Sequence, residues 1–340
     1  MKINIVTFYW SNNLGALIQA FSLKKFIEEE CKKSIKFNSY APKKLVEKER
    51  ISQINKKYSS VLLNVFSKKI KLFFWKKKFL NCKLPSQKII DYQDDLYIYG
   101  SDEIWNYQIF GFDPFFFGKD NIKKKISYAS SVGNIDLKND NSIMSIKDYL
   151  KKFEEISVRD SFTQKFIKDC IGKEPVIVLD PCYLVNLENF SIFKKNYNLD
   201  TKNYTLVYGD YFDKRQIDII KNFSKKNNWK IISIGFYNAW ADKNFISADP
   251  VDLIKYIIGS KQVFTSMFHG VMLSYKYNKQ FWISRDPYRI NKLSYFTEYL
   301  NLNNRYIENF GDHKINYNIN KDKISDWINL SKNFLLKNTS

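Results

Sequence analysis

The chain has 340 residues and a formal net charge of +20, and 44% of its residues are hydrophobic. This length suggests about two domains, and the apolar content, with only 11 Gly and 7 Pro, excludes a disordered protein. No stretch approaches the roughly 18 apolar residues of a membrane span. The apolar run at the start of the sequence is too short for a signal peptide, so the expected location is the cytoplasm.

The basic residues are uneven in type, because only six of the 55 are arginine. Lysines are scattered along the chain beside abundant Asn and Ile, which indicates compositional drift; a nucleic-acid or anionic-membrane partner is the other interpretation of the charge. An arginine that is kept in such a lysine-rich chain indicates a site where the planar guanidinium binds a carboxylate or a phosphate. The six are Arg50, Arg159, Arg215, Arg285, Arg289 and Arg305. Four separated cysteines without a Cys-x-x-Cys pair argue against a zinc site or a disulfide framework.

Strand-like apolar runs alternate with helical patterns, which predicts βαβ units and parallel sheets. In chain order, strands are expected over 3–8, 96–99, 125–129, 156–158 and 176–179, with an amphipathic helix over 16–29. After a polar break at 196–203, strands are expected over 204–208, 230–235, 262–265 and 281–284, and a helix over 321–337. The predicted fold class is therefore α/β, with Rossmann-like domains over 1–196 and 203–320 that face a cleft, and with 321–340 packing back as a helix.

Residues 68–80 form a basic segment with interleaved aromatic side chains. Such a segment lies on an anionic membrane surface in some proteins. The other interpretation is a helix with its aromatic side chains in the core and its lysines in solvent. Both interpretations stay open at this stage.

Polar residues follow several predicted strands, at the edge where open α/β sheets bind ligands. Asn13 and Gly15 precede the first helix, whose free N–H groups suit an anion or sugar hydroxyls, although simple capping explains the same residues. After the strand over 96–99, Asp102 supplies a carboxylate and Trp105 offers an aromatic face of the kind on which sugars stack. A capped turn with a core Trp is the alternative.

His269 is one of only two histidines and stands between a predicted strand and the helix-like residues 271–275. An imidazole at such a turn transfers a proton or binds an anion, and a buried structural histidine is the alternative. Arg159 ends another predicted strand, where it holds an anion or simply pairs with Asp160. The Asp180-Pro181 turn after a further strand favours a structural role.

Seven motifs occur in order along the chain. They are Asn-x-Gly-Ala-x-x-Gln-Ala (13–20), Gly-Ser-Asp-x-Ile-Trp-Asn (100–106), Ser-Tyr-Ala-Ser-Ser (127–131), Ser-Val-Arg-Asp (157–160), Leu-Asp-Pro (179–181), Phe-His-Gly (268–270) and Arg-Ile-x-x-Leu (289–293). Together they resemble the polysaccharide pyruvyl transferase family. Two departures are Glu103, where Gln is usual, and Met267, where many relatives carry Ser and others have an Arg just before the His. The cation for an anionic donor must therefore come from elsewhere.

The resemblance implies a GT-B-like fold and transfer of pyruvate from phosphoenolpyruvate to a sugar of a bacterial cell-surface polysaccharide, forming a cyclic ketal. Phosphoenolpyruvate is then a co-substrate, and no metal or other cofactor is expected. The acceptor is a glycan or a lipid-linked oligosaccharide, and peripheral contact with the anionic inner membrane surface is allowed. No nucleic acid is expected as a partner.

The residues and the resemblance together suggest roles for individual positions, and the role of Arg285 rests mainly on the scarcity of arginine in this chain. His269 is the expected acid or phosphate-contacting cation, Arg159 an anion clamp, and Asp102 a base or acceptor-orienting group. The expected donor-binding residues, in the second domain, are Ser266, Gly270, Arg285 and Arg289. The expected acceptor-binding residues, in the first domain, are Asn13, Gly15, Ser101 and Trp105.

Two other functions fit the same sequence. A GT-B-type glycosyltransferase would use a nucleotide-sugar in the same kind of cleft, although no Glu-rich donor motif is evident near the last strands. A non-catalytic binder of nucleic acid or membrane would use the net charge of +20, and its binding would depend steeply on salt.

Overall fold

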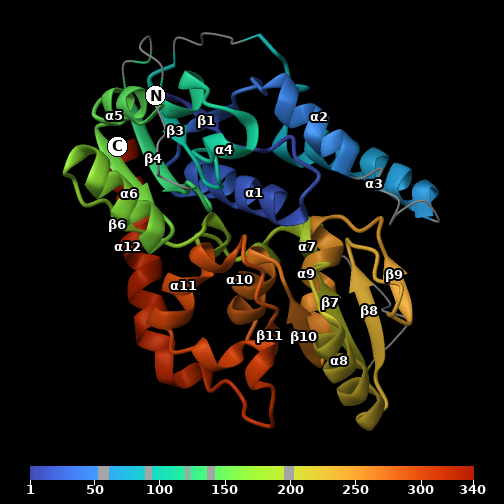
Figure 1. Cartoon of the computed structure of the whole chain (residues 1–340). Coiled ribbons are helices and arrows are strands. Elements are labelled where there is room, and N and C mark those ends of the chain that lie inside the picture. The colour runs from blue at the N-terminus through green and yellow to red at the C-terminus, as the bar shows by residue number, and fades with distance from the viewer. Residues whose placement is uncertain (53–60, 89–93, 119–121, 123, 136–141, 195–202) are drawn as a thin grey trace.

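The structure is a computed structural model of the chain and describes residues 1–52, 61–88, 94–118, 122, 124–135, 142–194 and 203–340. The described residues form two parallel sheets, one in each half of the chain (Figure 1). The first sheet has the order β2 (Ser34–Phe37), β1 (Lys2–Val6), β3 (Leu96–Tyr99), β4 (Lys125–Ser130), β5 (Glu155–Val158) and β6 (Val176–Ile177). The second has the order β11 (Phe281–Ile283), β10 (Gln262–Thr265), β7 (Tyr204–Tyr208), β8 (Lys230–Ile234) and β9 (Lys243–Phe245). These topologies confirm the predicted α/β class with two Rossmann-like units.

Most strand residues are buried, as expected for parallel strands that helices cover on both faces. Burial on both faces makes each strand a continuous apolar run, which is why the sequence predicts most strands at their observed positions. The exceptions are β2 and β9, which are not predicted from the sequence. Each is the edge strand of its sheet and is partly exposed, so neither carries an apolar run.

Helices alternate with the strands in both halves. In the first half they are α1 (Leu14–Glu29), α2 (Lys43–Ser52), α3 (Leu62–Trp75), the π-helical η2 (Lys76–Leu80), α4 (Tyr107–Phe110), η3 (Pro114–Phe117), α5 (Ser142–Leu150), α6 (Ser161–Ile171), η4 (Pro181–Tyr183), η5 (Leu187–Asn189) and α7 (Ser191–Lys194). In the second half they are α8 (Lys214–Lys226), α9 (Pro250–Gly259), α10 (Phe268–Lys276), α11 (Ile290–Tyr299), η6 (Asn303–Arg305), η7 (Ile307–Asn309), η8 (Tyr317–Asn320) and α12 (Lys321–Thr339). Within the described chain, none of these helices combines the length and the apolar character that crossing a bilayer requires.

The carboxyl ends of the two sets of strands face each other across α1. This helix is buried on nearly all sides because it packs on the first sheet and also contacts α9 and α10 of the second half (Figure 1). Tyr208, the last residue of β7, contacts the backbone of Gly15 just after β1. Two parallel sheets that meet at their carboxyl ends give the GT-B-like arrangement that the sequence predicts, and ligands of open α/β sheets bind at such ends.

The helix α12 returns from the second half to the first sheet. The indole N–H of Trp327 donates to the carbonyl of Ile177 at 2.9 Å, and the hydroxyl of Ser331 accepts the N–H of Leu179 at 2.9 Å. Both backbone partners lie at or just after β6, the edge of the first sheet. The predicted domain boundary at 196–203 lies outside the described residues apart from Asn203.

Candidate active site

Three strands of the first sheet end in charged side chains that meet one another. Asp102 follows β3, Arg159 follows β5 and Asp180 follows β6. Nη2 of Arg159 lies 3.4 Å from Oδ1 of Asp102, and Nη1 lies 3.7 Å from Oδ2 of Asp180. The Arg159 side chain is only 2% exposed, so these carboxylates balance its charge instead of water. Arg159 is thus a buried counter-charge of these carboxylates, and its role as a clamp for a donor anion stays a prediction.

His269 reaches this cluster from the second half. It is the second residue of α10, and its ring nitrogen Nε2 lies 3.3 Å from Oδ2 of Asp180. The ring of the preceding Phe268 lies 4.6 Å from the guanidinium of Arg159. Burial acts to raise the pKa of Asp180, but the opposing effects of His269 and Arg159 are larger together and lower it. Asp180 is thus a carboxylate held between the imidazole of His269 and the guanidinium of Arg159.

Gly15 of α1 lies against another edge of the His269 ring. A Cβ atom at position 15 would stand 2.2 Å from Nδ1 of His269, so any larger residue displaces the imidazole. The carboxamide oxygen of Asn13 accepts the N–H of Gly15 at 2.9 Å and caps α1. The imidazole is held between Gly15 and Asp180 of the first half, although His269 belongs to the second.

Glu103, next to Asp102, forms a second ion pair. Its carboxylate pairs with Lys292 of α11, accepts the hydroxyl of Tyr288 at 2.5 Å and accepts the amide of Asn106 at 3.0 Å. Burial acts to raise the pKa of Glu103, but the charges of Lys292 and Arg159, with these hydrogen bonds, outweigh it and lower the pKa to about 2. The Glu at a position where Gln is usual is therefore neutralised by Lys292.

The lowered pKa of Glu103 predicts a pH-dependent stability. The ordinary pKa of this carboxyl is 4.5. The ionised group therefore contributes its full share to the free energy of unfolding above pH 4.5, and this share is lost as the pH falls toward 2. We expect Glu103→Gln to lower the free energy of unfolding at neutral pH, and we expect the difference from wild type to shrink as the pH falls from 5 to 2. Urea unfolding at a series of pH values measures this. Glu174→Gln, at the exposed ion pair with Lys168, is the matched control and should change little. A deficit of equal size at every pH would contradict the assignment.

The two remaining predicted arginines lie in different surroundings. Arg289 pairs with Asp286. Burial raises the pKa of Tyr208 at the end of β7, and the positive charge of Arg289 opposes this rise. Arg285 is exposed, and its guanidinium lies 4.0 Å from the ring centroid of Tyr306. Arg289 is therefore linked electrostatically to Tyr208, whose ring lies against Gly270, the residue after His269.

Two predicted acceptor contacts are parts of the protein interior. Trp105 is fully buried, and its indole N–H donates to the carbonyl of Phe116 at 2.9 Å. Ser101 is also fully buried, and its hydroxyl donates to the carbonyl of Ala129 at 3.2 Å. Neither side chain is accessible to a sugar, so both predictions are corrected. The turn after β3 directs them into the core, which the pattern of residue types does not reveal.

Ser266 and Gly270, the other predicted donor contacts, lie beside His269 at the end of β10. The hydroxyl oxygen of Ser266 accepts the N–H of Tyr211 at 3.4 Å. A Cβ atom at position 270 would stand 2.1 Å from Oγ1 of Thr265, so Gly270 allows α10 to approach β10 closely. Both residues thus support the turn that carries the imidazole.

Three residues of this cluster are not among the site residues predicted from the sequence. The sequence favours a structural role for Asp180, although its place at a strand end and inside a motif is a usable signal. Lys292 also lies inside a motif, but the many lysines of the chain hide it. Tyr288 carries no signal, because only the fold brings its hydroxyl to Glu103.

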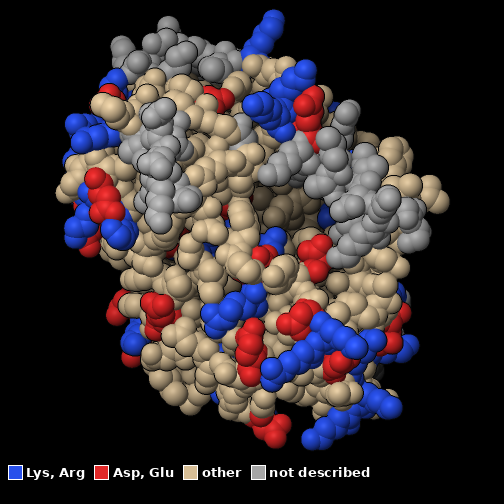
Figure 2. Space-filling model, in the orientation of Figure 1, with Lys and Arg blue, Asp and Glu red and all other residues tan. Residues whose placement is uncertain are grey.

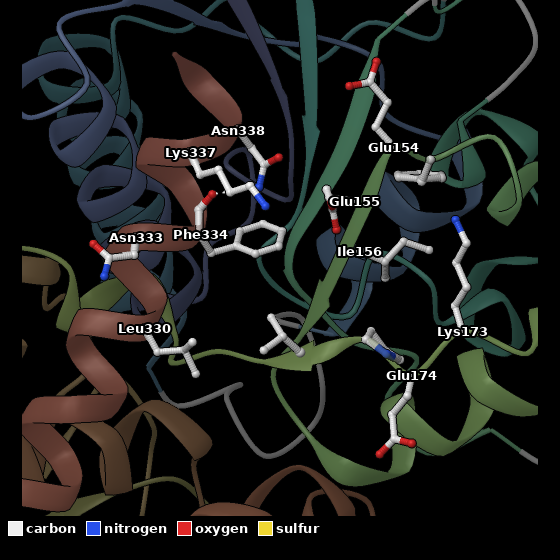
Figure 3. Close-up of a pocket in the computed structure, with 13 residues that line it drawn as sticks. Glu154, Glu155, Ile156, Lys173, Glu174, Leu330, Asn333, Phe334, Lys337 and Asn338 are labelled. Carbon is white, nitrogen blue, oxygen red and sulfur yellow. Dashed lines mark hydrogen bonds between the residues drawn. The ribbon is translucent and has the colours of Figure 1, made fainter.

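Figure 2 shows a hollow near the middle of one face, with acidic and basic side chains along its lower rim. A cavity of about 640 Å³ lies elsewhere, between α12 and the beginnings of β5 and β6 (Figure 3). Glu155 and Val176, the first residues of those strands, line it, so it lies at the amino ends of β5 and β6, whereas Arg159 and Asp180 follow their carboxyl ends. Over the described residues, no group of His, Cys, Asp and Glu side chains is suited to hold a metal ion.

Two parallel sheets whose facing strand ends meet in a buried acid–base cluster define an α/β protein of GT-B-like arrangement. A model of the polysaccharide pyruvyl transferase family matches residues 13–284, and the chain belongs to that family. The predicted family is thereby confirmed, and the chain is a transferase by its family. No curated protein matches the sequence.

Solved structures that resemble the chain share little sequence with it. The E. coli heptosyltransferase WaaC with ADP has 11% identity and a TM-score of 0.39, with 96% of this chain and 100% of that chain covered. UDP-GlcNAc 2-epimerase from Neisseria meningitidis bound to UDP-GlcNAc has 10% identity and a TM-score of 0.48, with 98% and 94% covered. These are weak likenesses, and no conclusion about activity rests on them.

Proposed function

We propose that the chain transfers pyruvate from phosphoenolpyruvate to a sugar of a bacterial cell-surface polysaccharide or of its lipid-linked precursor, and that it does so in the cytoplasm. Membership of the polysaccharide pyruvyl transferase family supports this proposal. The observation that carries it is the meeting of His269 from the second half with Asp180 from the first, at the facing strand ends. An imidazole oriented by a carboxylate suits proton transfer.

The reaction requires one proton to be gained at carbon and two to be lost by the sugar. A sugar hydroxyl adds to C2 of phosphoenolpyruvate while C3 gains a proton. Phosphate then leaves with the electron pair of its bond to C2, and a second hydroxyl closes the ketal. The second proton leaves with the phosphate. His269 is the proposed donor of the C3 proton or the cation beside the phosphate, and Asp102 orients or deprotonates the attacking hydroxyl.

The donor carries a carboxylate and a phosphate, which need positive partners. The first turn of α10 has no side-chain cap at Met267, its N-cap residue, so its N–H groups suit a phosphate. Arg289, whose side chain is 23% exposed, is the proposed cation, because its charge influences Tyr208, whose ring lies against Gly270 of this turn. We therefore assign donor binding to the start of α10 and to Arg289.

Ligand-induced stabilisation tests the donor. We expect phosphoenolpyruvate to raise the melting temperature and nucleotide-sugars to leave it unchanged, because only a ligand that binds the folded state stabilises it. In Arg289→Gln the rise should shrink, because the donor loses a cation. Arg285→Gln, on the neighbouring exposed arginine, is the matched control and should keep the full rise. Stabilisation by a nucleotide-sugar alone would favour the second candidate, a GT-B-type glycosyltransferase.

A further inference from the structure

The helix α3 has two apolar faces. Val65, Leu72 and Trp75 are buried on one face and attach the helix to the rest of the molecule. The opposite face is apolar and exposed, with Leu63 at 85% and Phe66 at 64%. Its members are Leu62, Leu63, Phe66, Ile70, Phe73 and Phe74. At about 100° per residue they form one stripe about 120° wide, which we call the α3 stripe.

The helix α3 lies at the periphery of the molecule (Figure 1). Isolated exposed apolar side chains are common on proteins, but a contiguous stripe marks an interaction surface. Three of its members are phenylalanines, and the rings of Phe73 and Phe74 contact each other with centroids 5.4 Å apart. Water therefore meets a continuous aromatic and aliphatic surface on this face.

The charged side chains of the segment that carries the α3 stripe are all positive. Residues 62–80 contain six lysines and no acidic residue. Some of these lysines turn inward: the ammonium of Lys68 donates to the carbonyl of Gly235 at 3.0 Å, and that of Lys71 donates to Asp252 at 2.5 Å. Lys77 and Lys78 are exposed, and Lys69 is half-buried at one edge of the stripe. An apolar stripe bordered by lysines complements a surface that is apolar below a layer of anions.

We propose that the α3 stripe docks the protein on an anionic membrane surface. The helix lies in the plane of the interface, the phenylalanines and leucines enter the boundary between head groups and acyl chains, and Lys69, Lys77 and Lys78 contact lipid phosphates. A second copy of the chain is a poorer occupant, because the same lysines would face one another and the net charge of +20 would add repulsion. The docking does not depend on the reaction that the enzyme catalyses.

Docking on this face also brings part of the candidate active site close to the lipid. The ammonium of Lys76, in η2 directly after α3, donates to the carbonyl of Trp10 at 2.8 Å. Trp10 belongs to the loop that leads to Asn13 at the start of α1. This loop is therefore tied to the docked helix, so a lipid-linked acceptor would present its sugar beside it. This last step rests on the proposed function, whereas the docking itself does not.

Vesicle binding tests the docking without any substrate. We expect the full chain to sediment with vesicles of phosphatidylglycerol and phosphatidylcholine, and to bind vesicles of phosphatidylcholine alone much more weakly. The variant Phe66→Ser/Phe73→Ser/Phe74→Ser should lower the partition coefficient by about 30-fold or more, because three rings leave the interface. Met144→Ser/Ile319→Ser removes two apolar side chains elsewhere that are more exposed than these phenylalanines, and it should bind like wild type.

The lysines are tested in the same assay. Lys69→Gln/Lys77→Gln/Lys78→Gln should lower the partition coefficient by about tenfold or more and weaken its dependence on salt. The matched control is Lys221→Gln/Lys225→Gln/Lys226→Gln, three exposed lysines of α8, and should bind like wild type.

Three results would overturn the proposal. They are no binding of wild type to the anionic vesicles, equal binding by the phenylalanine variant, and a dimer in light scattering that this variant dissociates. The last result would make the stripe a contact between copies. Failure of donor binding in the thermal-shift assay affects only the proposed function.

Discussion

Replacing His269 with alanine is expected to lower the turnover of pyruvyl transfer by about 10²- to 10⁴-fold, the range typical of a lost general acid. The imidazole lies at the meeting of the two sheets, 3.3 Å from an ionised carboxylate, and is nearly buried. Its removal takes away the proposed proton donor but leaves the first turn of α10 to bind phosphate. Release of phosphate from phosphoenolpyruvate in the presence of a glycan acceptor measures the effect.

The chain offers a matched control for this variant. His313, the other histidine, is exposed and packs its ring against Trp282 in the second half. His313→Ala should therefore retain the activity of wild type. Asp180→Asn keeps the shape of the site but removes the charge beside the imidazole. This single variant should lose activity, as His269→Ala does. Near-normal transfer by His269→Ala would remove this residue from the mechanism.

Replacing Arg159 with methionine is expected to lower the free energy of unfolding by about 3–5 kcal/mol. The side chain is buried among the carboxylates of Asp102, Glu103, Asp160 and Asp180, which together raise the pKa of the guanidinium despite its burial. Methionine fills much of the same volume but leaves those carboxylates without their shared counter-charge. Equilibrium unfolding in urea measures the loss.

Two further variants define what the Arg159 result means. Arg215→Met removes an exposed arginine on α8 and should change the free energy of unfolding by less than about 0.5 kcal/mol. Arg159→Met/Asp180→Asn removes a positive and a negative charge from the same cluster and should recover part of the loss. A variant Arg159→Met as stable as wild type would show that the cluster is not held together by this charge.

Much of the fold follows from local sequence, and so do the positions of several site residues. Parallel strands buried on both faces are apolar runs, so their ends, and with them Asp102, Arg159 and His269, are readable from the chain. Which of these side chains touch is set by the order of strands in each sheet and by how the two halves meet. The pairing of His269 with Asp180 arises from that long-range geometry, and no spacing in the sequence encodes it.

Residue type also misleads where burial decides the role. Trp105 has the surface to stack on a sugar, but it serves the core. Arg285 and Arg289 are four residues apart and equally rare in type, yet only Arg289 acts on the strand end beside His269. Lys292 neutralises Glu103, but nothing distinguishes it from the other lysines until α11 is placed against the first half.

The return of α12 to the first sheet has a consequence for how the protein is made. β6, the edge of that sheet, receives the hydrogen bond of Trp327 only after about 150 further residues of the chain have been synthesised. Until then the edge is open, and an open strand edge is a site for pairing with other chains. We therefore expect the edge of the first sheet to be completed only after the second half has been synthesised. We also expect the two halves to unfold as one cooperative unit.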